Sequence, residues 1–159
     1  MPSKSGLQLD FNVPIRFEQD VVGRPPHAHE DENPGVTGTL KLRFDEGLTE
    51  AKYKLYVHFS PKSSAEASIT MAHLHAAPAG DIGELVVILF ESDPPVRKDG
   101  LLKKGTITNS DIRSVTADNS RYNTVSTLYS SIRADTLYVD IHGTGKYLPG
   151  MLRGQIYTQ

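Results

Sequence analysis

Apolar and polar residues alternate with a period of two along much of the chain. One alternating segment is Leu7–Phe17 and a second is Val36–Phe44. Successive side chains of a strand point to opposite faces, so this alternation predicts half-buried β-strands. A third segment, Ala51–Phe59, follows across Asp45-Glu46-Gly47, which predicts a hairpin. Pro14 cannot donate a hydrogen bond to a ladder, so the first strand is expected at a sheet edge.

The second half of the chain predicts more strands and one helix. The continuous apolar run Leu85–Phe90 indicates a central strand covered on both faces. Val125, Leu128, Tyr129 and Ile132 recur instead at helical spacing, after Asn123 or Thr124 as a possible N-cap. A shorter helical turn is expected near Asn109 or Ser110. The further strands are expected at Ser68–His75, Glu84–Phe90, Thr136–His142 and Leu152–Thr158.

These elements predict an all-β fold. With about seven to eight strands and one or two short helices, we expect an antiparallel Greek-key β-sandwich or flattened barrel. The connections 18–35 and 92–106 are rich in proline, glycine and charge and are expected to be surface loops. The 159 residues fit one domain that occupies the whole chain, 1–159.

Composition excludes several classes of function. Lys plus Arg (17) against Asp plus Glu (19) leaves a net charge of -2, which argues against a nucleic-acid-binding surface. The chain has no cysteine, so disulfides and thiolate metal sites are excluded. No apolar run approaches the roughly 18 residues of a membrane span. No signal peptide is visible, because the start lacks an apolar core, and the sequence leaves the compartment open.

The histidines carry the most specific chemistry. The six histidines include two His-x-His pairs, His27-Ala28-His29 and His73-Leu74-His75, where random placement would give about 0.2 pairs. On a strand, residues i and i+2 share a face about 6.5 Å apart, so two imidazoles can converge on one metal ion. Nitrogen ligands of this kind suit zinc or copper. If these histidines bind a cofactor, we expect it to be copper or zinc.

Other residues complete the predicted metal site. His142 is the candidate for a third ligand. Asp140, two residues earlier, could bind the metal itself or accept a hydrogen bond from a histidine ligand. His27 and His29 are further candidate ligands, although histidines in an acidic loop can equally be solvated. His73 and His75 could also serve only as structural hydrogen-bonding groups. His58 lies on a polar face and is expected to be a surface residue.

Three segments together resemble the CHRD (chordin-type) domain family. Met71–Gly83 is similar to that family's "Ala-His-x-His … Ala-Gly-x-x-Gly" motif, and Leu137–His142 with Pro149–Ile156 is similar to its closing "Tyr-Val-x-Val-His-Thr … Pro-x-Gly-Glu-Ile-Arg-Gly-Gln". Val22–Pro26 resembles its "Glu-Val-Pro-Pro" element less closely. The match covers about residues 20–156. Gly143 stands where the family has Thr.

The resemblance implies a β-sandwich domain of secreted or cell-surface proteins. The His-x-His strand is also similar, more loosely, to the copper-ligand strand of copper–zinc superoxide dismutase, another Greek-key fold. Fold alone does not carry activity. A second departure from the family pattern is Met151, which replaces the glutamate before Leu-Arg-Gly-Gln.

Arg153 and Gln155 share one face of the last predicted strand. If that face is interior, Arg153 must be paired, because an unpaired buried charge is costly. We expect Asp140 to be its partner. In this interpretation Asp140, Arg153 and Gln155 support the site structurally, and Arg153 is more readily a satisfied buried group than a catalytic one.

Three functions fit these residues. The first is a binding module that holds a metal ion and recognises a protein or a glycan. The second is a metalloenzyme, with superoxide dismutase-like or other small-molecule chemistry at the same histidines. The third is a structural or assembly domain without metal. The first is favoured, because a dismutase usually needs a second, histidine-bridged ion, and only His27 and His29 could supply extra ligands, with nothing in the sequence to place them near His73. Exposed edge strands would permit a homo-oligomer.

Overall fold

The computed structural model describes residues 6–17, 33–113, 115–117 and 120–159, and most of them form β-strands. The described strands are β1 (Asp10–Ile15), β2 (Val36–Phe44), β3 (Glu50–Phe59), β4 (Ile69–Ala76), β5 (Glu84–Val96), β6 (Gly100–Thr108), β7 (Val115–Ala117), β8 (Ser120–Tyr122), β9 (Leu137–His142) and β10 (Leu152–Gln155). The helical segments are α1 (Val125–Arg133) and the single turns η3 (Ala65–Ala67), η4 (Asn109–Asp111) and η5 (Gly145–Tyr147).

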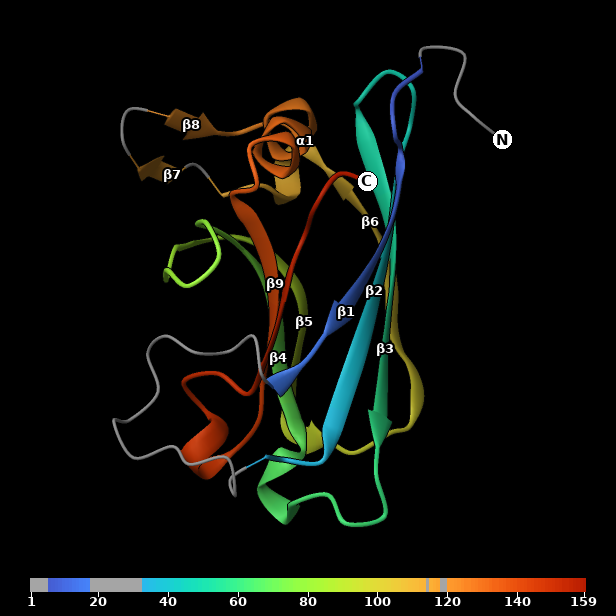
Figure 1. The fold of residues 1–159 in the computed structure, drawn as a ribbon, viewed down its shortest axis with the longest axis vertical. Coiled ribbons are helices and arrows are strands. Elements are labelled where there is room, and N and C mark those ends of the chain that lie inside the picture. Colours follow the sequence, from blue (N-terminus) through green and yellow to red (C-terminus); the bar gives the residue numbers. More distant parts are fainter. Residues whose placement is uncertain (1–5, 18–32, 114, 118–119) are drawn as a thin grey trace.

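Two four-stranded antiparallel sheets pack face to face (Figure 1). The first sheet has the order β1-β2-β3-β6 and the second the order β10-β9-β4-β5, while β7 and β8 form a separate hairpin. The chain leaves the first sheet after β3 and returns to it with β6, which gives the strands β3 to β6 a Greek-key order. The predicted antiparallel β-sandwich is confirmed.

Alternation determines which side chains enter the core. Along β2 the burial alternates strictly, so that Leu40 and Leu42 are buried while Lys41 and Arg43 are exposed. The predicted hairpin is confirmed, with Arg43 opposite Lys52. In the second sheet, Leu74 of β4 and Val139 of β9 are opposite each other and face the same core. The other face of both strands therefore lies on the outer surface of the sandwich.

The two sheets also approach each other at one edge. Arg16, just beyond β1, exchanges two backbone hydrogen bonds with Arg153 of β10 (2.9 and 3.0 Å). The sandwich is therefore partly closed into a flattened barrel at this edge. Pro14 lies on β1, an outer strand of its sheet, as predicted.

Helix α1 begins and ends close to its predicted bounds. Thr124 is the N-cap, because its side chain accepts a hydrogen bond from the backbone N–H of Thr127. Leu128 and Ile132 are completely buried on one face of the helix. No helix in the described ranges has both the length and the apolar character needed to cross a bilayer.

Two sequence predictions are wrong, and both concern the strands at one edge. The segment 92–106 was expected to be a surface loop, but β5 continues to Val96 and β6 begins at Gly100. Leu85–Phe90 is not a central strand, because β5 lies at the edge of its sheet and Ile88 is 43% exposed. Bulges in the pairing of β5 with β4 turn both Val86 and Val87 inward, which explains the continuous apolar run.

Candidate functional site

Three histidines and one aspartate meet on the outer face of the second sheet. His73 and His75 lie on β4, and Asp140 and His142 lie on the neighbouring strand β9. His73 is directly opposite Asp140, and opposite residues of an antiparallel pair share a face. Each of the four residues offers a ligand atom, and these atoms lie within 4.8 Å of one another. We call this group the histidine cluster.

This part of the outer face is buried. His73 is 5% exposed, and Asp140 and His142 are each 8% exposed. Two loops approach the cluster through their carbonyl groups, the loop between β4 and β5 and the loop that contains η5. The cluster therefore lies in a region of low dielectric constant, where an unpaired charge or polar atom is expensive.

Each loop holds one imidazole by its Nδ1 atom. His75 Nδ1 lies 3.0 Å from the carbonyl oxygen of Gly83, and His142 Nδ1 lies 2.8 Å from that of Leu148. A carbonyl oxygen can only accept a hydrogen bond, so both Nδ1 atoms must carry the hydrogen. In the neutral imidazole, Nε2 then carries a lone pair, which can bind a cation.

Both Nε2 atoms point at one carboxylate oxygen. Asp140 Oδ2 lies 2.8 Å from His142 Nε2 and 3.1 Å from His75 Nε2. Burial alone raises the pKa of Asp140, but its contacts with His142 and His75 outweigh burial and hold that pKa well below its ordinary value. Asp140 is therefore an anion. Lone pairs on two imidazoles beside an anion would repel it unless protons or a metal cation lie between them.

His73 is held less closely than the other two imidazoles. Its Nδ1 atom lies 4.0 Å from Asp140 Oδ1, and its Nε2 atom lies 3.7 Å from Glu91 Oε1. Burial lowers the pKa of His73 and outweighs the opposing effect of Asp140. His73 Nε2, His75 Nε2 and Asp140 Oδ1 are buried atoms without a hydrogen-bond partner among the described residues. All three belong to the histidine cluster.

Arg153 and Gln155 fix the loop between β4 and β5. The Arg153 guanidinium donates hydrogen bonds to the carbonyl oxygens of Asp81 (2.6 Å) and Pro78 (3.0 Å), and to Gln155 Oε1 (3.1 Å). Gln155 Nε2 donates in turn to the carbonyl oxygen of Ala77, at 3.1 Å. This is the loop whose end, Gly83, holds His75.

The expected ion pair between Arg153 and Asp140 is wrong. The two residues are opposite each other on β10 and β9, but within the described part of the chain Arg153 binds carbonyl oxygens and Gln155. Its guanidinium lies 3.5 Å from the centroid of the Tyr138 ring. Asp140 Oδ2 lies beside His142 and His75 instead, so the carboxylate and the guanidinium on this face have different partners.

Glycine at position 83 is required by a close approach of backbone. A Cβ atom there would lie 1.8 Å from the carbonyl oxygen of Ala76. The same residue also donates its backbone N–H to the Tyr138 hydroxyl, at 3.2 Å. The Gly83 carbonyl therefore contacts His75, and the Gly83 N–H contacts Tyr138.

Of the other three histidines, only His58 lies within the described residues. His27 and His29 lie outside them and stay untested as ligands. His58 is exposed, as predicted, and lies 3.4 Å from Asp99. Two contributors were missed by the sequence reasoning, Glu91 and Tyr138. Tyr138 could have been found, because it lies two residues before Asp140 on the same face of a predicted strand.

The donor set fits a borderline or soft divalent ion better than a hard one. Imidazole nitrogens suit zinc and copper, whereas magnesium and calcium take oxygen ligands. Metal–nitrogen bonds of 2.0–2.1 Å place neighbouring ligands of a tetrahedral site about 3.3 Å apart. The 2.8 and 3.1 Å separations at Asp140 Oδ2 are close to that value, so a small outward shift would admit an ion.

Comparison with known proteins identifies one family. The family model described as the CHRD domain matches residues 18–156, most of the chain. No curated protein and no solved structure matches the chain significantly.

Proposed function

The chain belongs to the CHRD domain family, and we propose that it is a binding module whose histidine cluster holds a zinc or copper ion. The proposed ligands are Nε2 of His75, Nε2 of His142, a carboxylate oxygen of Asp140 and a ring nitrogen of His73. The resemblance to the family supports the domain assignment alone, and the ion is inferred from the donor atoms.

One observation carries this proposal. The backbone carbonyls of Gly83 and Leu148 occupy the Nδ1 atoms of His75 and His142, so that both Nε2 atoms face the Asp140 carboxylate. A histidine that binds metal commonly donates its other ring N–H to a carbonyl or carboxylate, which orients the ring. Here that arrangement is present twice around one anion.

The number of donors favours binding over catalysis. Four protein ligands complete a tetrahedral zinc site, whereas catalytic sites keep one position for water or substrate. A metalloenzyme, including one with dismutase-like chemistry, is the second candidate, because His73 is the most loosely held donor. If His73 does not bind the ion, one coordination position is open, on the side of the cluster where Glu91 lies.

Metal analysis of protein purified without a histidine tag tests the proposal. We expect about one equivalent of zinc or copper per chain in the wild type, and its loss in the double variant His75→Ala/His142→Ala. His58→Ala is the matched control, because it removes an exposed imidazole outside the cluster. A wild-type protein that binds neither ion in competition with a chelator would leave the domain as a structural module.

A spectroscopic measurement separates the two metal-binding functions. Cobalt substituted for zinc reports the coordination number through its visible spectrum. A four-coordinate spectrum that changes in His73→Ala supports the binding module. A spectrum unchanged by His73→Ala, together with superoxide or hydrolytic turnover, would favour the enzyme.

A further inference from the structure

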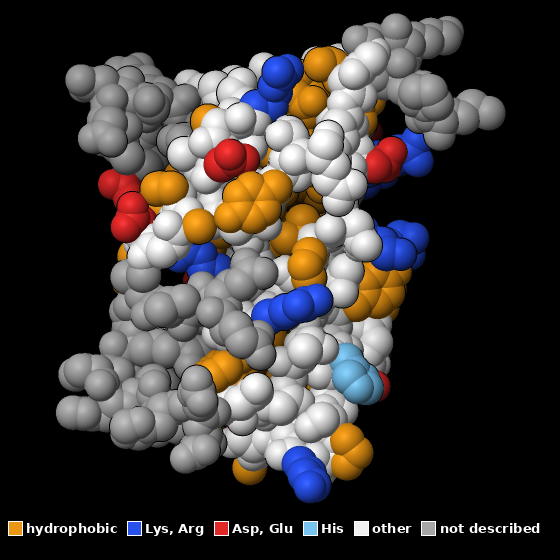
Figure 2. Space-filling model, viewed as in Figure 1, with side chains coloured by type: hydrophobic (Ala, Val, Ile, Leu, Met, Phe, Trp, Pro, Cys, Tyr) orange, Lys and Arg blue, Asp and Glu red, His pale blue; other side chains and the backbone are white. Residues whose placement is uncertain are grey.

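The outer face of the first sheet carries a concentration of positive charge. Five cationic side chains project from three adjacent strands. We call this group the basic face: Lys41 and Arg43 on β2, Lys52 and Lys54 on β3, and Lys104 on β6. Lys and Arg side chains project from the right-hand side of Figure 2, where β2 and β3 lie in Figure 1. The chain as a whole has a net charge of -2, so these cations are segregated.

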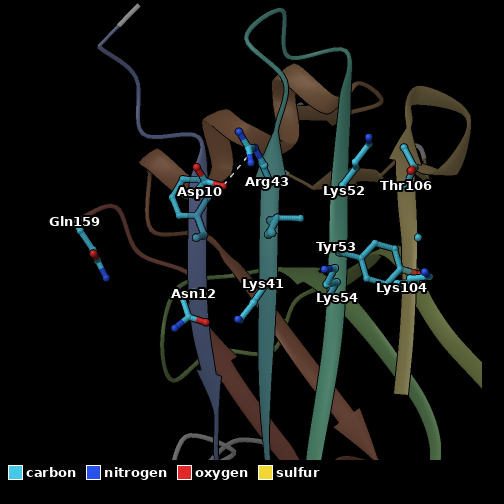
Figure 3. Close-up of a pocket in the computed structure, with 13 residues that line it drawn as sticks. Asp10, Asn12, Lys41, Arg43, Lys52, Tyr53, Lys54, Lys104, Thr106 and Gln159 are labelled. Atoms are coloured by element: carbon cyan, nitrogen blue, oxygen red, sulfur yellow. Dashed lines mark ion pairs between the residues drawn. The ribbon is translucent and has the colours of Figure 1, made fainter. Parts of the chain in front are cut away.

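Three of the lysines form a row across the sheet. Lys41 is directly opposite Lys54, and Lys54 is directly opposite Lys104. Figure 3 shows these side chains on adjacent strands, with Arg43 and Lys52 in the next row. Neighbouring strands are about 4.8 Å apart, and like charges directly opposite each other are destabilising. The row therefore has a cost in the free protein that a bound polyanion would remove.

Among the described residues, Arg43 is the only member of the basic face that forms an ion pair. Arg43 pairs with Asp10 at 3.6 Å, but the four lysines have no ion-pair partner among the residues that the structure describes. Protection of a sheet edge does not explain Lys41, Lys52 and Lys54, because β2 and β3 are central strands. The five side chains border a hollow of about 850 Å³.

The neighbouring rows have the polar character of a sugar-binding surface. Beyond Lys41, the same face continues with Thr39 opposite Tyr56 and Thr37 opposite His58. The threonine and tyrosine hydroxyl groups can donate hydrogen bonds to sugar hydroxyls and accept hydrogen bonds from them. Tyr56 is not an open stacking platform of the kind single-stranded nucleic acids use, because the Lys41 ammonium lies 5.6 Å from its ring centroid.

We propose that the basic face binds an acidic polysaccharide, one that carries a carboxylate on successive sugar rings. A polymer with regularly spaced anions contacts several ammonium groups at once, and the joint contacts raise the avidity beyond that of one pair. The surface lies on the opposite side of the sandwich from the histidine cluster. The proposal is therefore independent of the metal site, and either can fail alone.

Binding to polygalacturonate, with uncharged dextran as the control polymer, tests the proposal. We expect the wild type to bind polygalacturonate at low salt, to release it as salt rises, and to ignore dextran. The triple variant Lys41→Gln/Lys54→Gln/Lys104→Gln should lose at least about tenfold in affinity, because it removes the whole row. Exposed substitutions of this kind leave the fold nearly unchanged, which circular dichroism checks.

A second triple variant controls for net charge. Lys62→Gln/Lys98→Gln/Lys146→Gln also removes three positive charges, but from exposed positions outside the basic face. It should bind polygalacturonate within about twofold of the wild-type affinity. Equal losses in the two triple variants would overturn the proposal, as would a wild type that does not bind polygalacturonate. Tighter binding of a duplex DNA through the same lysines would also overturn it, in favour of a nucleic-acid partner.

Discussion

The guanidinium of Arg153 lies 3.5 Å from the ring centroid of Tyr138. Tyr138 also stacks on His75, with ring centroids 5.1 Å apart and planes inclined by 8°. Since β9 lies between β4 and β10, the tyrosine separates the arginine from the histidine. This stack joins the closing motif of the chain to the His-x-His motif. It explains why residues almost eighty positions apart act on one site.

Substitution of Arg153 by alanine should destabilise the protein and weaken the site. The change leaves the carbonyls of Pro78 and Asp81 without their donor in a buried region, which costs about 3 kcal/mol in the free energy of unfolding. Urea denaturation measures this loss, and metal titration measures the accompanying fall in affinity. Arg43→Ala is the control, because its ion pair is 75% exposed at the arginine and should be worth less than about 1 kcal/mol. Similar costs for the two variants would contradict the buried role of Arg153.

Gly83→Ala should displace the loop that holds His75. The new Cβ would lie 1.8 Å from the Ala76 carbonyl oxygen, so the backbone must move and the contact from Gly83 to His75 Nδ1 lengthens. We expect a destabilisation above about 2 kcal/mol and a loss of about 10- to 100-fold in zinc affinity. Calorimetric titration with zinc measures the affinity.

Gly80→Ala separates steric overlap from backbone strain. Gly80 has a φ of +87°, but nothing lies within 4 Å of a Cβ built on it. Its substitution should cost about 1–2 kcal/mol through left-handed backbone strain and leave the zinc affinity nearly unchanged. If both glycine variants lose zinc affinity equally, the effect at position 83 is not specific to the His75 anchor.

Removal of metal should lower the melting temperature of the wild type. An ion that binds only the folded state adds about 2.7 kcal/mol of stability when its free concentration is 100 times the dissociation constant. Thermal denaturation before and after treatment with a chelator, and again after zinc is restored, measures this contribution. His75→Ala/His142→Ala should show no response to either treatment. A shift of equal size in that double variant would place the bound metal elsewhere.

Much of the fold could be predicted because alternation is a local property. Val36–Phe44 has the same bounds in the sequence and in the structure, since every second residue of β2 faces one core. The meeting of His73, His75 and His142 could also be anticipated, because each histidine lies on a strand with strong periodicity.

Other features depend on tertiary contacts that alternation does not encode. Strand β6 contains Lys103 and Lys104 in succession and lies at an edge, so its pattern is weak. Glu91 reaches His73 only because bulges shift the register of β5. The anchors of His75 and His142 are backbone carbonyls, and any residue type supplies those. Sequence reasoning therefore found the imidazoles but not the groups that orient them.

The metal-free protein should lose stability as the pH falls below neutral. Burial lowers the pKa of His73 beneath its ordinary value of 6.5, so below pH 6.5 the unfolded chain takes up a proton that the folded protein resists. This contribution to stability is complete above pH 6.5 and is lost as the pH falls toward the folded-state pKa. Asp140, whose pKa lies below its ordinary 3.8, adds a second loss of stability beneath that pH.

Urea denaturation of chelator-treated protein from pH 8 to pH 4 measures the first effect, that of His73. His73→Gln should flatten the curve between about pH 7 and 5, whereas His58→Ala should leave it as in the wild type. An unchanged curve in His73→Gln would show that this imidazole is not forced to stay neutral by its burial beside His75 and His142.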